Sequence, residues 1–260
     1  MSAQDSGEPS WKRGGALIAA GITVGVVIAA ISAGKSCGGA PPVPGRAAVD
    51  AAAFDDSASP VPVTAEDPMS GDRDALVTLV MFGNFQCPHS ARAQSDLATL
   101  KTELGPKKLR LVWKTLVVAT HEKSRAAGVA GAAVHTLGGS EAFFKFHDLA
   151  FKNRAFLGPE SYLAWGAEAG VDKLRLHEAL SDKAYEQKVE ADGLLAKSLG
   201  IDRTPTYVVN GVVAEGPASL DDLRALVTTE LRKAEAKIAA GTPPGRVYVT
   251  VSKENRAKKP

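Results

Sequence analysis

The sequence predicts an α/β fold whose elements run in the order βαβ, a block of helices, a β-hairpin and a terminal helix. Two nearly continuous apolar, β-branched runs at residues 75–83 and 109–118 enclose a stretch with helical periodicity, the pattern of a parallel βαβ unit. An Asn-Gly pair at 210–211 lies between two further strand-forming runs, which predicts a hairpin. The 260 residues, 45% of them hydrophobic, suffice for one sizeable domain with appendages.

An uncharged apolar segment at residues 14–34 predicts a membrane-spanning helix, because about twenty such residues cross a bilayer core. Lys12 and Arg13 precede it, so residues 1–13 are expected in the cytoplasm and the remaining chain on the extracytoplasmic, periplasmic side. A cleaved signal peptide is one alternative. A lipoprotein acylated at Cys37 is another, although Lys35 fits such processing poorly. All three place the domain where disulfides persist.

The next segment, residues 35–73, is rich in Ala, Pro, Gly and acidic residues and predicts a flexible linker. Val61 and Val63 flank Pro62 and are candidates for a short edge strand. The folded domain is expected over residues 74–240. Its first strand, 75–83, is followed by Cys87 and then by a helix with leucines three and four residues apart, which ends near Gly105. The second strand is 109–118.

A helical insertion is expected over about residues 122–200, with helices near 126–137, 141–151, 159–170, 172–180 and 184–199. Its aromatic residues are expected to pack in its core: Phe143, Phe144, Phe146, Phe151, Tyr162 and Trp165. After the hairpin at 205–216, Ser219 and Asp222 have the spacing of a capping box and open the terminal helix. Residues 241–260 are expected to form a basic tail, in which Val247, Val249 and Val251 alternate as in a late strand.

Charge and composition exclude several function classes. The net charge is +2 and basic residues cluster only at the C-terminal end, without interleaved aromatics, so a nucleic-acid partner is not expected. Two cysteines, Cys37 and Cys87, exclude a disulfide-stapled scaffold, and the absence of CxxC and HExxH motifs argues against a metal site. No Gly-rich phosphate loop follows a strand, so no cofactor is implied.

The stretch FQCPHS, residues 85–90, carries the chemistry. Cys87 falls where the first strand gives way to a helix, and unpaired N–H groups and the helix dipole at that position stabilise a thiolate. Pro88 suits the first helical position, and His89 can add positive charge or a hydrogen bond. A lone cysteine is commonly a small buried hydrophobe. The Pro, the His and the strand-to-helix position together favour a reactive thiol.

The motifs VTLVMFGNFQCPHS and GIDRTPTYVVNGVV, in this order and separation, resemble the DsbA-like family of extracytoplasmic thiol–disulfide oxidoreductases, over about residues 74–240. The resemblance implies a thioredoxin-like fold and protein substrates that carry cysteines or disulfides. It also implies a cis Pro205, with Thr204 and Pro205 facing Cys87, and a substrate chain bound along the backbone beside Pro205. From the residues alone, a trans Thr204-Pro205 turn is equally compatible.

The sequence departs from the family pattern at two positions. Ser90 replaces a second cysteine, and Met81 stands where many relatives carry a buried acid that serves that cysteine. Cys87 can therefore form a mixed disulfide, but Ser90 can only cap the helix or hydrogen-bond the thiolate. Release then needs another substrate thiol, a small thiol or a partner protein. Cys37, at the end of a long linker, is a further candidate for a resolving thiol, a dimer bridge or an inert residue.

The sequence thus predicts isomerase- or reductase-like exchange, with Cys87, His89 and Ser90 at the catalytic centre and Pro88, Thr204 and Pro205 contacting substrate. One alternative is a redox-inactive binding or chaperone-like module that retains the fold. A cysteine hydrolase is the other, with a helical histidine as its base. The candidates for that base are His121, His135, His147 and His177, of which His121, after the second strand, is placed best to approach Cys87.

Overall fold

The computed structural model describes residues 56–214 and 219–257 of the chain. Its centre is a five-stranded sheet with the strand order β1-β3-β2-β4-β5. The strands are β1 (Met69–Ser70), β2 (Val77–Gly83), β3 (Leu109–Thr115), β4 (Thr206–Val209) and β5 (Val212–Ala214). The helices are α1 (Pro88–Leu104), α2 (Ser124–Lys152), α3 (Pro159–Glu168), α4 (Lys173–Ala179), α5 (Lys183–Ser198), α6 (Leu220–Ala239) and α7 (Pro244–Ala257), with the 3₁₀ helix η2 at Arg154–Phe156.

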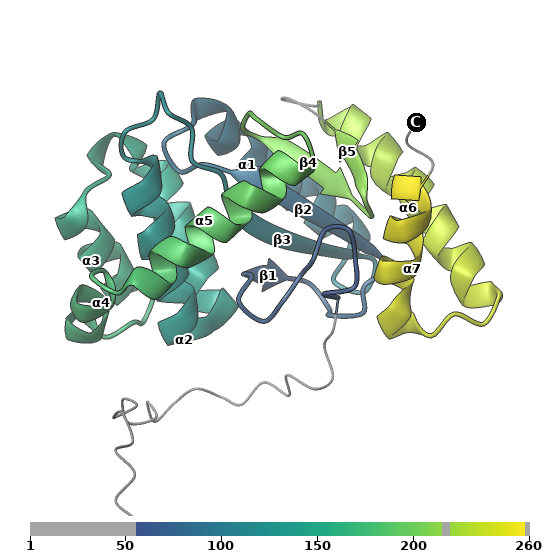
Figure 1. Cartoon of the computed structure of the whole chain (residues 1–260), viewed down its shortest axis with the longest axis horizontal. Coiled ribbons are helices and arrows are strands. Elements are labelled where there is room, and N and C mark those ends of the chain that lie inside the picture. The colour runs from purple at the N-terminus through teal and green to yellow at the C-terminus, as the bar shows by residue number, and fades with distance from the viewer. Residues whose placement is uncertain (1–55, 215–218, 258–260) are drawn as a thin grey trace, which may run out of the picture. The chain divides into compact units, whose positions relative to one another are not determined.

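The predicted βαβ unit is confirmed, because β2 and β3 pair in parallel and α1 connects them. Every residue of β2 is buried, as the continuous apolar run predicts for a strand covered on both faces. Side chains alternate between two core clusters: Leu79 and Met81 pack with Leu97 of α1, whereas Val80 and Phe82 pack on the opposite side with residues of α5. Figure 1 shows α5 crossing in front of the sheet, with α2, α3 and α4 to the left and α6 and α7 to the right.

The hairpin and the cap of α6 also agree with the sequence. β4 pairs antiparallel with β2 and β5 antiparallel with β4. Asn210 and Gly211 both have positive φ, 43° and 87°, as a type I′ turn requires. Ser219 and Asp222 form a reciprocal capping box at the start of α6.

The helical insertion consists of α2, η2, α3, α4 and α5, as expected. The two helices expected at 126–137 and 141–151 form one long element interrupted at Gly139, whose φ of 76° is not helical. The aromatic residues of the insertion form a core with Phe85 of the active-site loop and Trp113 of β3. The rings of Phe85 and Trp113 stack with their centroids 5.1 Å apart. Phe146 is fully buried and meets the Phe85 ring edge-on. Core packing of the aromatic band is therefore confirmed.

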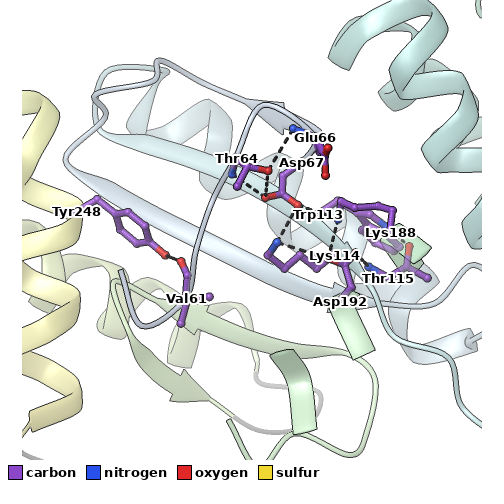
Figure 2. Close-up of polar contacts among 10 residues, drawn as sticks. All are labelled: Val61, Thr64, Glu66, Asp67, Trp113, Lys114, Thr115, Lys188, Asp192 and Tyr248. Atoms are coloured by element: carbon purple, nitrogen blue, oxygen red, sulfur yellow. Dashed lines mark hydrogen bonds and ion pairs between the residues drawn. The ribbon is translucent and has the colours of Figure 1, made fainter. Parts of the chain in front are cut away.

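The expectation of a flexible linker is wrong for residues 56–73. Val61 and Val63 are fully buried against the second face of the sheet, although neither lies in a strand. The edge strand is instead β1, in which Met69 pairs with Val112. The Tyr248 hydroxyl donates to the carbonyl of Val61 at 2.6 Å (Figure 2). The segment contributes few apolar side chains, so its composition alone does not reveal that it docks.

Two buried cations on β3 hold this segment in place. Arg110 is fully buried; its Nη2 lies 2.7 Å from Asp56 Oδ2 and donates to the hydroxyl of Thr78. Lys114 Nζ lies 2.7 Å from Asp67 Oδ1 (Figure 2). A buried cation needs a charged partner, and the segment before β2 brings both carboxylates.

Lys188 and Asp192 of α5 complete a buried four-charge cluster with Asp67 and Lys114. Asp192 also accepts from the backbone N–H of Thr115 at 2.9 Å (Figure 2). Burial alone would raise the pKa of the Asp67 carboxyl, but Lys114 and Lys188 outweigh it and hold that pKa below its usual range. The cluster joins α5, β3 and the segment before β1 on one face of the sheet.

The expectation of a basic tail at residues 241–260 is wrong for the part that the structure describes. Residues 244–257 form α7, which packs on α6 and β5. Val247 and Val251, one helical turn apart, are buried against Ala234 of α6. The Val-x-Val alternation suggests a strand, but tertiary packing overrides this local preference. Asn255 of α7 also donates to the carbonyl of Asn210 in the hairpin turn at 2.8 Å.

The predicted membrane-spanning segment at 14–34, Cys37 and linker residues 35–55 lie outside the described residues. Within 56–214 and 219–257, no helix has both the length and the apolar character needed to cross a bilayer.

We predict that Asp67→Ala lowers the free energy of unfolding by about 3 kcal/mol at pH 7, because the buried Lys114 and the half-buried Lys188 are left with one carboxylate between them. The loss should fade as the pH falls through the lowered pKa of Asp67, since the wild type then loses the same ion pairs by protonation. Urea denaturation at a series of pH values measures the loss of stability and its pH dependence. Glu190→Ala, which breaks an exposed ion pair between α5 and Arg125 of α2, serves as the control and should cause no measurable change. Equal losses of unfolding free energy in Asp67→Ala and Glu190→Ala would contradict the stabilising role assigned to the ion pairs of Asp67.

Candidate active site

The register of the sheet brings Cys87 and Thr204 together. Phe82 of β2 pairs with Thr206 of β4, so the residues that follow β2 and precede β4 meet at one end of the sheet. The Cys87 thiol donates to the carbonyl of Thr204 with an Sγ–O distance of 3.3 Å. The Thr204–Pro205 peptide bond is cis. Residues 117 positions apart in the sequence therefore form one site.

The thiol lies at the N-terminus of α1. Cys87 is the N-cap residue, with extended backbone angles, and Pro88 follows at the start of the helix. Burial by itself raises the pKa of the Cys87 thiol; the Thr204 side chain, the Ser90 backbone N–H and hydroxyl, and the His89 backbone N–H outweigh it, and the pKa is lowered. The arrangement therefore stabilises the thiolate relative to that of an ordinary cysteine. The side chain is nonetheless only 2% exposed, so a partner disulfide must approach along a restricted path.

Ser90 is fully buried beside the thiol. Its hydroxyl accepts a hydrogen bond from the backbone N–H of Asn84 at 3.4 Å, and its carbonyl accepts one from the Gln94 side chain at 2.8 Å. The same Gln94 amide lies 3.8 Å from the sulfur of Met81, which is buried on β2. The two departures from the family pattern are thus linked through one glutamine.

The other expected site residues differ in their exposure. The His89 side chain is exposed, and its backbone N–H is the group that favours the Cys87 thiolate. Pro88 and Thr204 are half-buried, and Pro205 is buried. The structure thus brings Cys87, Ser90 and Thr204 into contact and leaves the imidazole of His89 at the surface.

Three residues around the active-site loop were not predicted from the sequence. Asn84 is buried immediately after β2, where an Asn can signal a side-chain-stabilised turn. Arg154 of η2 donates to the carbonyl of Gln86 at 3.0 Å, and the Gln86 side chain accepts from the backbone N–H of Lys123 at 2.8 Å. No local pattern marks Gln86 or Arg154, because their contact joins segments 68 residues apart.

The four candidate histidines occupy different environments. His121 joins the active-site network, with Nδ1 3.2 Å from the Asn84 amide nitrogen. His147 packs in the aromatic core, where burial lowers its pKa, and burial lowers the pKa of His135 to about 4. His177 is exposed on α4. Within the described ranges, no group of three or more His, Cys, Asp or Glu side chains is arranged to hold a metal ion.

The thioredoxin family model matches residues 64–229. Among curated proteins, a Na⁺/H⁺ antiporter, NhaA 1, of Salinispora arenicola is 31% identical over 170 residues, 65% of this chain and 26% of the antiporter. The chain thus spans about a quarter of the length of the first antiporter relatives that it matches. Disulfide bond formation protein D of Bacillus subtilis is 27% identical over 188 residues, 68% of this chain and 82% of that protein.

Solved structures also resemble this chain. Oxidised BdbD of Bacillus subtilis superposes with a TM-score of 0.60 at 24% identity, over 67% of this chain and 97% of BdbD. The thiol-disulfide exchange protein α-DsbA2 of Wolbachia pipientis superposes with a TM-score of 0.57 at 25% identity, over 63% of this chain and 86% of that one. The thioredoxin-like fold and the resemblance to DsbA-type proteins are confirmed.

We predict that Ser90→Ala raises the pKa of Cys87, because a hydroxyl that favours the thiolate is lost. The pH dependence of alkylation by iodoacetamide measures the midpoint. Ser95→Ala on the same helix is the matched control, since that hydroxyl binds the carbonyl of Arg92. An unchanged or lower midpoint in Ser90→Ala would show that the hydroxyl does not support the thiolate.

Proposed function

The chain belongs to the thioredoxin family, and from this we propose that it is a membrane-tethered, extracytoplasmic thiol–disulfide exchange protein that works through the single thiol of Cys87. The observation that carries the proposal is the position of that thiol, at a helix N-terminus and 3.3 Å from the carbonyl before a cis proline. The names of two relatives, disulfide bond formation protein D and thiol-disulfide exchange protein, support the same chemistry.

In the first step, the Cys87 thiolate attacks one sulfur of a substrate disulfide. A bond forms between Sγ and that sulfur, the substrate S–S bond breaks, and the second substrate sulfur leaves as a thiolate. One disulfide replaces another, so this step involves no net oxidation or reduction. The N–H groups at the start of α1 stabilise the attacking thiolate, and the Ser90 hydroxyl adds a further donor.

The second step needs a thiol from outside the site, because Ser90 cannot attack the mixed disulfide. An incoming thiolate attacks the substrate sulfur, and Cys87 leaves as the thiolate. If the incoming thiolate is another cysteine of the substrate, the substrate disulfide is isomerised. If it belongs to a small thiol or a partner protein, the substrate leaves with one free thiolate and a mixed disulfide to that thiol. A second external thiol then displaces the substrate sulfur, so two external thiols are oxidised to a disulfide and the substrate is reduced. Cys87 returns unchanged in either case.

We assign substrate contact to Pro88, Thr204 and Pro205. The carbonyl of Thr204 already meets the thiol, so a substrate chain extended along this backbone would have its disulfide beside Sγ. We assign His89 to tuning of the thiol through its backbone N–H, which favours the Cys87 thiolate, while its imidazole is exposed.

The membrane tether is proposed from residues 14–34, whose uncharged apolar sequence follows Lys12 and Arg13. The relatives named as Na⁺/H⁺ antiporters support a location at a membrane, since a domain like this one forms part of their chains.

We predict that a Cys37→Ala chain forms Cys87-linked mixed disulfides with disulfide-containing proteins but no internal disulfide, because Cys87 is then its sole thiol. Ser90→Cys in the same background should add an internal disulfide and reduce the mixed species that accumulates, because a resolving thiol is restored. Acid quenching and mass spectrometry measure both. Absence of mixed disulfides in both chains would favour the redox-inactive binding module.

We also predict that the full-length chain sediments with membranes and that a membrane-impermeant maleimide labels Cys87 in intact spheroplasts. The labelling uses the Cys37→Ala background, because Cys37 follows the tether on the same side of the membrane, and Cys87→Ala in that background provides the blank. Recovery of the chain in the soluble fraction, or labelling only after lysis, would contradict the tether or the orientation.

A further inference from the structure

Asn84 lies between β2 and the active-site loop, and it is 1% exposed. Its Oδ1 accepts a hydrogen bond from the backbone N–H of Gln86 at 2.8 Å, and its carbonyl accepts one from the N–H of Cys87 at 3.0 Å. Its own N–H donates to the Ser90 hydroxyl at 3.4 Å. One residue therefore fixes the course of the chain from the end of β2 to the first turn of α1.

The amide nitrogen of the same side chain binds the loop between β3 and α2. It donates to the Ser124 hydroxyl at 2.8 Å and to the carbonyl of Leu116 at 3.3 Å, and it lies 3.2 Å from Nδ1 of His121. An amide has two N–H bonds, so the Ser124 hydroxyl and the Leu116 carbonyl can accept one each. Asn84 thereby ties the active-site loop to the loop that follows the neighbouring parallel strand.

We propose that Asn84 positions Cys87 for thiol–disulfide exchange by holding the backbone of the active-site loop against the loop between β3 and α2. The inference rests on the proposed exchange function. Asn84 acts through the loop. The thiolate is favoured by the Thr204 side chain and by the backbone N–H groups of Ser90 and His89, and such hydrogen bonds weaken steeply when their angle changes. Those N–H groups are part of α1 and cannot reorient individually. The orientation of Cys87 relative to them therefore depends on the hydrogen bonds by which Asn84 holds the active-site loop.

Asn210 offers a matched comparison at the other end of β2. It is equally buried; its Oδ1 accepts from the backbone N–H of Thr78 at 2.9 Å, and its amide donates to the carbonyl of Leu76 at 3.2 Å. Asn210→Ala removes buried hydrogen bonds of the same kind and leaves the active-site loop untouched. A general loosening of β2 would affect both variants, whereas positioning of Cys87 depends on Asn84.

The test is a pH titration of the Cys87 thiolate by ultraviolet absorbance, in the full-length chain with Cys37→Ala as background. Asn84→Ala should raise the pKa of Cys87 by about one pH unit, the loss of roughly one hydrogen bond to a charged group. Ser124→Ala, which removes the nearest acceptor of the amide, should raise it by less. Asn210→Ala should lower thermal stability without moving the Cys87 midpoint.

Each alternative result has a separate meaning. A low midpoint in the wild type that stays unchanged in Asn84→Ala overturns the positioning role and leaves the exchange function intact. An equal rise in Asn210→Ala overturns it in favour of general loosening. A wild-type midpoint near the ordinary thiol value of about 8.5 removes the exchange function and this inference with it. If Asn84→Ala does not fold, Ser124→Ala decides, and an unchanged midpoint there overturns the proposal.

Discussion

The pairing of β2 with both of its neighbours is the constraint on which the site depends. α1 begins after the carboxyl end of β2 and leads back to its parallel partner β3, and the antiparallel partner β4 brings the cis-proline turn to that same end of β2. A shift of one residue in the register of β2 would exchange its two buried faces and move Cys87 away from Thr204. Because both faces of β2 are packed, that shift would cost a large part of the core.

At the thiol itself, two opposing physical effects meet. Burial favours the neutral form of Cys87, whereas hydrogen bonds from the Thr204 side chain and from donors at the start of α1 favour the thiolate and prevail. A site of this kind needs a rigid arrangement of its N–H groups, which the surrounding contacts of Asn84 and Gln86 provide. Ser90 keeps a donor beside the sulfur and replaces a resolving thiol. In the proposed single-thiol mechanism, the chemistry then stops at the mixed disulfide until another thiol arrives.

Local patterns in the sequence predict the order of strands and helices, the Asn210-Gly211 turn and the place of Cys87 at a helix start. The same patterns misjudge the two ends of the domain. The segment before β1 docks because Asp67 neutralises a buried lysine on β3, and α7 forms because its valines pack on α6. Both depend on partners outside the segment itself, which its local pattern does not show. Asn84 was missed for the same reason, since its amide binds a loop more than thirty residues further along.

The most direct test of single-thiol exchange is the recovery of a protein substrate with scrambled disulfides, followed by its activity. The account predicts that the chain accelerates recovery in a Cys87-dependent manner, without an oxidant and with no net loss of substrate thiols, because Cys87 returns unchanged after each exchange. Recovery no faster than with Cys87→Ala would contradict it. The chain would then be a thioredoxin-fold module whose thiol takes no part in its function.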